Sequence, residues 1–170
     1  MTKSKFSFRA LGLAAGLAGS VLCMQSSIAA TTSTTFTVNA TVLSSCLLAA
    51  TNLNFGNYSA VDASPNDATN TITATCNNGE DYTLALDAGV SPGATVAARA
   101  MVNGLDTLDY ALYTTAARTT IWGDGTLGTA TVSSVGTGLP QLFTVYGRVP
   151  DGQSVTAGLY ADLITVTLTF

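Results

Sequence analysis

The side chains that could carry out catalysis in this chain are nearly all carboxylates. The sequence has no His, and its only lysines are Lys3 and Lys5. Composition therefore excludes Ser-His-Asp and Cys-His nucleophiles, as well as a lysine base later in the chain. Acid and base catalysis of the glycosidase type would need two carboxyl groups, and the candidates are Asp106 with Asp109, Glu80 with Asp81, and Asp124. Each stands beside turn residues with nothing nearby to raise its pKa, so we interpret them as solvated turn carboxylates and predict no catalytic residue and no cofactor.

Four further side chains could bind a ligand. Asp124 lies between two glycines, but a calcium loop presents several oxygen ligands at fixed spacing and one Asp is weak evidence for it. Trp122 could stack on a sugar, yet a single Trp at the end of a strand favours a core anchor or a rim cover. Arg99 and Arg148 are interpreted as partners of ordinary surface ion pairs, because acidic residues surround them in the sequence. We predict no metal site.

The first thirty residues have the pattern of a secretion signal. Lys3, Lys5 and Arg9 precede an apolar run from Ala10 to Met24. The run is shorter than the roughly 20 apolar residues of a membrane-spanning helix, and no later segment approaches that length. We therefore predict a signal peptide over residues 1–29, cleaved near 29/30 or 30/31, and an exported chain with no membrane span after cleavage.

Removal of the signal leaves a strongly acidic chain. Arg99, Arg118 and Arg148 are then the only basic residues, against ten acidic ones, so the formal net charge is about −7. A surface that binds polyanions needs clustered positive charge. Nucleic acid and anionic membrane are therefore poor partners. The remaining length of about 140 residues suits one domain with a sizeable core.

Two cysteines follow the signal, Cys46 and Cys76, whereas Cys23 lies in the apolar run and is interpreted as a discarded signal residue. An even pair in an exported protein predicts a disulfide. By closing this loop the disulfide would stabilise the fold by roughly 3 to 4 kcal/mol in the chain-entropy estimate. Zinc would need further Cys or His ligands that the chain lacks.

Strand-like alternation occurs directly after the signal and again at the end of the chain. Residues 36–42 place Phe36, Val38, Ala40 and Val42 on one face, and residues 163–170 do the same with Ile164, Val166, Leu168 and Phe170. A domain that ends on such a strand has an open sheet edge, which favours pairing with another chain. The alternative is that residues 36–42 are an ordinary first strand in the domain's own sheet.

Two-residue periodicity continues through the rest of the chain. Asn78-Gly79 is typical of a tight turn, so we predict that residues 71–76 and 82–87 pair as an antiparallel hairpin. Only residues 94–102 could make a short helical turn. Many short strands separated by Gly and Pro predict a single β-sandwich domain, with further strands at 53–58, 108–113, 119–122, 129–135, 142–149 and 159–170.

An ordered set of short motifs resembles the spore coat protein U domain family. The resemblance covers essentially everything after the signal, including both cysteines. The motifs are individually weak, but their combination in this order is fairly specific. They are Phe55-Gly56-Asn57-Tyr58, Ala74-Thr75-Cys76, residues 82–89, residues 108–113, Tyr146-Gly147-Arg148-Val149-Pro150, residues 158–162 and residues 166–170.

That family includes major subunits of archaic chaperone-usher pili, and the resemblance implies an incomplete immunoglobulin-like β-sandwich completed by a donor strand from a neighbouring subunit. It implies an N-terminal donor-strand extension at 30–44 and a pilin-like domain at 45–170. The acceptor groove, which also contacts the chaperone, would run beside Ile164, Val166, Leu168 and Phe170. The donor side chains would be Thr34, Phe36, Val38, Ala40 and Val42.

The resemblance also implies partners and a location. The partners would be identical or related subunits, a periplasmic chaperone and an outer-membrane usher. The protein would be exported through the periplasm to a cell-surface fibre that supports adhesion or biofilm formation. One alternative is a spore or cell-coat structural protein of the same fold. Another is a carbohydrate-binding or hydrolytic module that uses Trp122 and the carboxylates.

Overall fold

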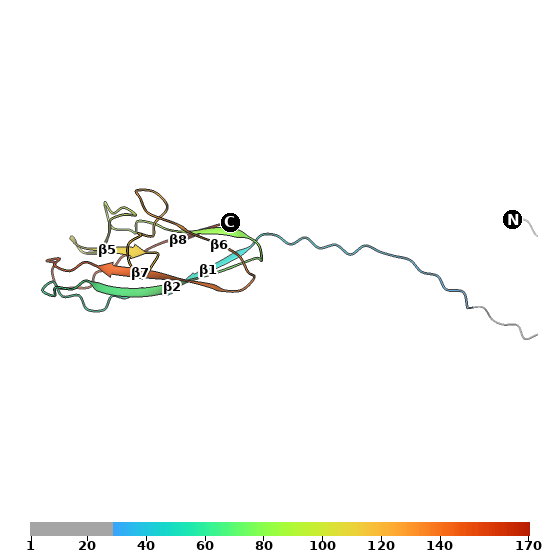
Figure 1. Ribbon diagram of the computed structural model, residues 1–170, viewed down its shortest axis with the longest axis horizontal. Helices are drawn as coiled ribbons and strands as arrows, with labels where there is room; N and C mark the ends of the chain where they lie inside the picture. Colours follow the sequence, from blue (N-terminus) through green and yellow to red (C-terminus); the bar gives the residue numbers. More distant parts are fainter. Residues whose placement is uncertain (1–28) are drawn as a thin grey trace, which may run out of the picture. The chain divides into compact units, whose positions relative to one another are not determined.

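The computed structural model describes residues 29–170 (Figure 1). The chain divides into two compact units, Met1–Ala40 and Thr41–Phe170. In the first unit, residues 29–40 have no strand and every side chain is exposed. The predicted signal peptide, apart from residue 29, lies outside the described residues.

The second unit is an all-β sandwich. A five-stranded sheet has the order β1-β2-β7-β5-β4, and a three-stranded sheet has the order β6-β3-β8, with every pairing antiparallel (Figure 1). Residues 29–170 contain no helix. The predicted fold class is thus confirmed as all-β with two packed sheets. The strands are β1 Cys46–Ala50, β2 Asn66–Cys76, β3 Asp81–Leu86, β4 Arg99–Asn103, β5 Asp106–Tyr113, β6 Val132–Val135, β7 Gln141–Val149 and β8 Val166–Thr169.

Alternating side chains of the two sheets form the core between them. On β2, Ile72 and Ala74 are buried, and on β3, Tyr82, Leu84 and Leu86 are buried, while the residues between them are less buried. This is the two-residue period expected of strands with one face against a core. Trp122 is 1% exposed and its Nε1 donates a hydrogen bond to the Leu84 carbonyl at 3.1 Å. The interpretation of Trp122 as a core anchor is confirmed.

The predicted hairpin between residues 71–76 and 82–87 is wrong. The two segments are β2 and β3, and they belong to different sheets. Gly79 has the expected positive φ of 83°, but its N–H donates to the Gly136 carbonyl at 2.8 Å, and the Gly136 N–H donates to the Glu80 carbonyl at 2.7 Å. The turn therefore pairs with the segment after β6, and β2 and β3 bury their apolar faces against each other.

Residues 53–58 are not the predicted strand either. Leu53, Phe55 and Tyr58 nevertheless pack against the core. The backbone pairing is absent because a side chain of β2 replaces it, with Asn66 Nδ2 donating to the carbonyls of Phe55 and Asn57, both at 2.9 Å. The segment is extended but held by amide side chains.

The suggested helical turn at 94–102 is wrong, because Thr95 pairs with Ala98 and β4 begins at Arg99. The Arg99 side chain is 1% exposed and donates hydrogen bonds to three main-chain carbonyls, those of Leu86, Asp87 and Trp122. These bonds hold β4 extended against the end of β3. Three other predicted strands are shorter than expected. Residues 119–122 form only isolated bridges, at Ile121 and Trp122. The strands found within residues 129–135 and 159–170 are β6 and β8.

Candidate functional site: an open groove beside the terminal strand

The last strand of the chain, β8, is an edge strand. It pairs with β3 on one side, from Val166 opposite Leu86 to Thr169 opposite Thr83, and has no strand on its other side in the described part of the chain. The inward side chains Ile164, Val166 and Leu168 pack against the core but remain only partly buried. The sandwich is therefore open beside β8.

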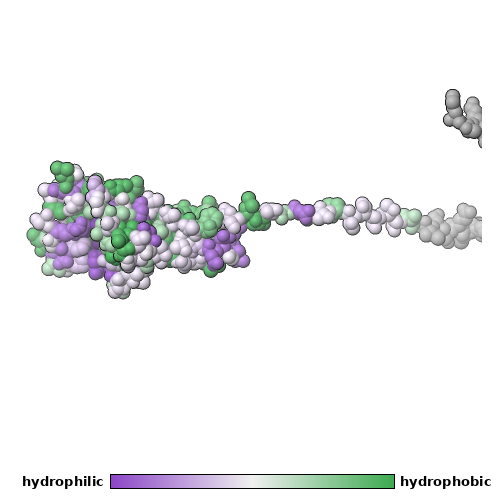
Figure 2. Space-filling view, turned by 90° about the horizontal axis from the view of Figure 1, so that it is seen from above, coloured by the Kyte–Doolittle hydropathy of each residue, from purple (hydrophilic) through white to green (hydrophobic). Residues whose placement is uncertain are grey.

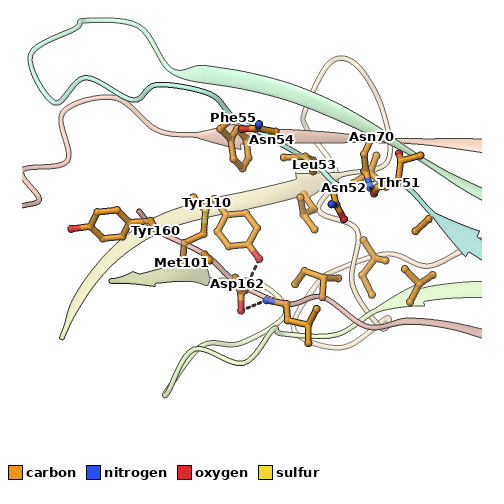
Figure 3. Close-up of a pocket in the computed structure, with 18 of the residues that line it drawn as sticks. Thr51, Asn52, Leu53, Asn54, Phe55, Asn70, Met101, Tyr110, Tyr160 and Asp162 are labelled. Atoms are coloured by element: carbon orange, nitrogen blue, oxygen red, sulfur yellow. Dashed lines mark hydrogen bonds between the residues drawn. The ribbon is translucent and has the colours of Figure 1, made fainter. Parts of the chain in front are cut away.

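A groove of about 580 Å³ opens next to this edge (Figure 3). One side is the segment that follows β1, where Figure 3 shows Leu53, Asn54 and Phe55, and the other is the segment that leads into β8, where it shows Tyr160 and Asp162. The floor comes from core strands, so an occupant of the groove would contact the hydrophobic core directly. Its apolar lining includes Ile72, Leu86, Met101, Leu112, Val145, Ile164 and Val166.

The segment leading into β8 is fixed by hydrogen bonds at both of its ends. Ala161 pairs with Val102 of β4 through main-chain bonds of 2.9 and 3.2 Å. The Thr165 N–H donates to Asp87 Oδ1 at 2.9 Å, and the Asp87 N–H donates to the Thr165 carbonyl at 3.1 Å. These hydrogen bonds therefore fix the position of the segment that leads into β8, which forms this wall of the groove.

The polar groups at one end of the groove are bonded to each other. The Tyr110 hydroxyl donates to Asp162 Oδ2 at 2.6 Å (Figure 3). Asp162 Oδ1 also accepts the Val90 N–H at 2.8 Å. Burial of Tyr110, followed by its bond to the Asp162 carboxylate, raises the pKa of Tyr110 far above its ordinary value. Tyr110 is thus a neutral donor that holds the Asp162 side chain in place.

The alternating segment at 36–42 has no strand partner in this structure. Phe36 is 86% exposed, and Val38 and Val42 are each 81% exposed, while Thr34 and Ala40 are exposed as well. Figure 2 draws this segment as uncovered spheres of mixed hydropathy. The structure therefore contains an apolar strand-like segment without a sheet and a sheet edge without a strand.

Two of the four predicted acceptor residues line the groove, a third lies on the same face of β8, and the fourth lies elsewhere. Ile164 and Val166 line the groove and Leu168 continues the same face of β8. Phe170 is 55% exposed. It lies instead in a shallower hollow with Tyr82, Val135 and Thr169.

The predicted disulfide between Cys46 and Cys76 is present. Cys46 is the first residue of β1 and Cys76 the last residue of β2, and the two stand directly opposite each other in the strand register. The bond therefore joins the start of the edge strand β1 to a strand that lies inside the sheet.

The carboxylates considered for catalysis do not line the groove, and three of them accept hydrogen bonds from hydroxyl groups. Asp106 accepts a hydrogen bond from the Thr156 hydroxyl, and Glu80 accepts one from Ser44 Oγ at 2.8 Å. Asp124 Oδ1 accepts both the hydroxyl and the N–H of Thr126, which lowers the pKa of Asp124. Residues 29–170 hold no group of three or more His, Cys, Asp or Glu side chains arranged for a metal ion.

The arginines have structural roles. Arg148 forms a bidentate pair with Asp67, with bonds of 2.7 and 2.8 Å, and Arg118 approaches the same carboxylate at 3.2 Å. The hydrogen bond from Arg148 is the main reason that the pKa of Asp67 is lowered. The interpretation of Arg148 as an ion-pair residue is confirmed, whereas Arg99 is buried and donates to carbonyls, so surface pairing of Arg99 was wrong.

Sequence reasoning missed two amide side chains that bond to the main chain of other segments, Asn70 in the lining of the groove and Gln153 outside it. Asn70 Nδ2 donates to the Thr51 carbonyl at 2.6 Å, and Gln153 binds the main chain of Asp109 through both ends of its amide, at 2.7 and 3.0 Å. Both side chains take the place of a neighbouring strand. No periodic signal marks such residues, because one amide leaves the alternation of its own strand unchanged.

In the part of the chain that the structure describes, no helix has the length and apolarity needed to cross a bilayer.

Fold and groove together define a β-sandwich domain with an uncovered sheet edge and a separate strand-like extension. The sequence profile of the Spore Coat Protein U domain matches residues 32–167, and the chain belongs to this family. It is 36% identical to Protein U of Myxococcus xanthus over 131 residues, which are 69% of this chain and 71% of that protein.

A solved structure shares the fold. It is the CsuC–CsuE chaperone–tip adhesion subunit pre-assembly complex from archaic chaperone-usher Csu pili of Acinetobacter baumannii, with a TM-score of 0.56 and 24% sequence identity. The match covers 76% of this chain and 40% of that one. At this identity the likeness establishes the fold alone.

Proposed function

We propose that the protein is an exported, non-enzymatic structural subunit that polymerises by donor-strand exchange. The extension at residues 30–44 of one copy would place its residues 34–42 in the groove beside β8 of the next copy. The observation that carries this proposal is the pairing of an open, apolar-floored groove with an exposed, alternating segment in the same chain. Exposed sheet edges favour addition of an extended strand.

The chemistry of the two surfaces is complementary. Thr34, Phe36, Val38, Ala40 and Val42 would face the floor of the groove, and the free edge of β8 would supply main-chain partners. Burial of one Phe and two Val at roughly 1.5 to 3 kcal/mol each contributes about 5 to 9 kcal/mol. Ladder hydrogen bonds add about 1 kcal/mol apiece, and the entropy cost of ordering the extension offsets part of the sum.

Assembly of this kind needs other proteins before the groove is filled. An apolar groove that stays open during export would aggregate, so we expect a periplasmic chaperone to cover it through Ile164, Val166 and Leu168 and an outer-membrane usher to receive the subunit. The chaperone–subunit complex found among proteins of the same fold supports this expectation. The product would be a cell-surface fibre, with adhesion or biofilm formation as its broader role.

A coat protein of the same fold is the second candidate, supported by the likeness to Protein U and by the family itself. It would use the same strand exchange but end in a spore or cell coat rather than a fibre. Electron microscopy of the assembled material separates the two. The carbohydrate-binding or hydrolytic alternative has little support, since Trp122 is buried and the candidate carboxylates lie outside the groove.

The test is gel migration of unboiled samples of the chain co-expressed with its chaperone and usher. We expect the full chain to give a ladder of SDS-resistant multimers and a chain without residues 30–42 to give monomers. Monomers from both would contradict strand exchange, and a ladder from both would show that another surface joins the subunits. Circular dichroism of both chains checks that the deletion leaves the sandwich folded.

A further inference from the structure

The start of the domain is attached to the turn between β2 and β3. Ser44 Oγ donates to Glu80 Oε2 at 2.8 Å. The Asn77 N–H donates to the Ser45 carbonyl at 3.1 Å, and Asn77 Nδ2 donates to the Leu43 carbonyl at 3.4 Å. Together with the Cys46–Cys76 disulfide, these contacts form what we call the root clasp, residues 43–46 held by residues 76–80.

Without the clasp, β1 would be the only attachment of the extension to the sandwich. It is a five-residue edge strand that pairs only with β2, and its Leu47 side chain is 72% exposed. β2 has eleven residues, lies between β1 and β7, and buries Ile72 and Ala74. The clasp therefore transfers the attachment from the weakly held edge strand to a strand inside the sheet.

The same edge strand also leads into the groove. Ala50, its last residue, lines the groove, and residues 51–55 continue that side. The ladder between β1 and β2 stops there, with the Thr51 N–H donating to the Thr71 carbonyl at 3.0 Å. The chain's own extension is therefore attached at the first residue of β1. The last residue of β1 borders the groove that would receive the extension of a neighbour.

We propose that the root clasp, and the disulfide above all, is a mechanical device that separates these two ends of β1. Tension on the extension would reach the clasp at residue 43 and pass through the Cys46–Cys76 bond into β2. β1 is then not pulled away from β2, and the groove stays closed around the neighbour's strand. This inference rests on the proposed strand exchange. It gives the disulfide a role under mechanical load, in addition to its contribution to the stability of the isolated domain.

The experiment stretches single polymers of the full chain at constant force and measures the rate at which they part. Polymers are compared before and after reduction, and with polymers of Cys46→Ser with Cys76→Ser. We expect the unloaded ladder in SDS to persist, and the rate of parting under load to rise by at least about tenfold when the disulfide is absent, because forced opening follows the unfolding rate.

Two relocated disulfides on the Cys46→Ser, Cys76→Ser background distinguish the load path from general stabilisation. Leu48 and Ala74 are directly opposite on β1 and β2, so Leu48→Cys with Ala74→Cys should restore slow parting. Thr73 and Leu142 are opposite on β2 and β7, so Thr73→Cys with Leu142→Cys should stabilise the sheet without restoring it.

The outcomes separate the two proposals. Equal rates of parting for oxidised and reduced wild-type polymers would overturn the clasp while leaving strand exchange intact, and so would equal rescue by both relocated disulfides. Absence of polymers from the wild-type chain would overturn strand exchange itself. If the serine variant does not fold, reduction of assembled wild-type polymers still gives the comparison.

Discussion

Arg99 is the residue with the most unusual surroundings in this domain. Its guanidinium is buried, and it donates to main-chain carbonyls of the β3 end and of Trp122 rather than to a carboxylate. Burial lowers the pKa of Arg99, but a guanidinium stays protonated in proteins. The charge is therefore retained in the interior because it satisfies carbonyl groups that have no strand partner.

We expect Arg99→Met to reduce the free energy of unfolding by about 2 to 4 kcal/mol, because three carbonyls lose donors inside the protein. Urea denaturation monitored by Trp122 fluorescence measures the change. Arg148→Met is the matched control, since Arg148 pairs at the surface with Asp67, and such pairs contribute about 1 kcal/mol or less. Equal losses for the two variants would contradict the role assigned to Arg99.

Asp87 makes the stability of the domain depend on pH in the acid range. Burial pushes the pKa of Asp87 upward, but the hydrogen bonds that Thr165 and Gly89 donate to its carboxylate outweigh burial and lower the pKa overall. A lowered folded-state pKa contributes stability above the unfolded value of about 3.9, and that contribution is lost as the pH falls through the folded value. We expect urea titrations to show wild-type stability falling below about pH 4. Asp87→Asn should fall less steeply, and an equal or steeper fall would show that other carboxylates dominate.

At the scale of elements, the sequence predicted most strands but not all of their neighbours. Periodicity identified β2, β3, β5, β7 and the inward face of β8, because alternation survives in any half-buried strand. It missed β1 and β4. It also paired β2 with β3, because an Asn-Gly turn indicates a local chain reversal but not whether the next strand stays in the same sheet. The groove depends on side-chain amides and on Gly147, which no periodic pattern marks.

Gly147 determines how closely the segment after β1 approaches β7. A Cβ at this position would lie 2.8 Å from Phe55 Cζ and 2.9 Å from Leu53 Cδ1. We expect Gly147→Val to push residues 53–55 away and to cost about 1 to 3 kcal/mol of unfolding free energy. Chemical denaturation tests this, with Thr144→Val on the exposed face of the same strand as control. Unchanged stability would mean that the segment adjusts freely.

At the scale of the whole molecule, the proposed strand exchange makes donor and acceptor different surfaces of one chain. An interface of this head-to-tail kind does not close on itself as a two-fold dimer does, so identical subunits would extend into an open chain. In that assembly the extension would be the donor surface of a subunit and the groove beside β8 its acceptor surface. Each function should therefore be removable without the other.

We expect Phe36→Asp to abolish donation and Val166→Asp to abolish acceptance, because either change would place a carboxylate against the apolar floor of the groove, where an unpaired charge is strongly disfavoured. Each variant alone should stay monomeric. Mixed, they should form only dimers, in which the Val166→Asp chain donates its intact extension to the intact groove of the Phe36→Asp chain. Size-exclusion chromatography with light scattering measures the masses.

Thr37→Asp and Thr167→Asp, on the opposite faces of the same segments, are the controls and should polymerise. Long polymers from either inward variant alone would show that these faces do not meet, and a mixture that stays monomeric would show that one of the two chains has lost both functions.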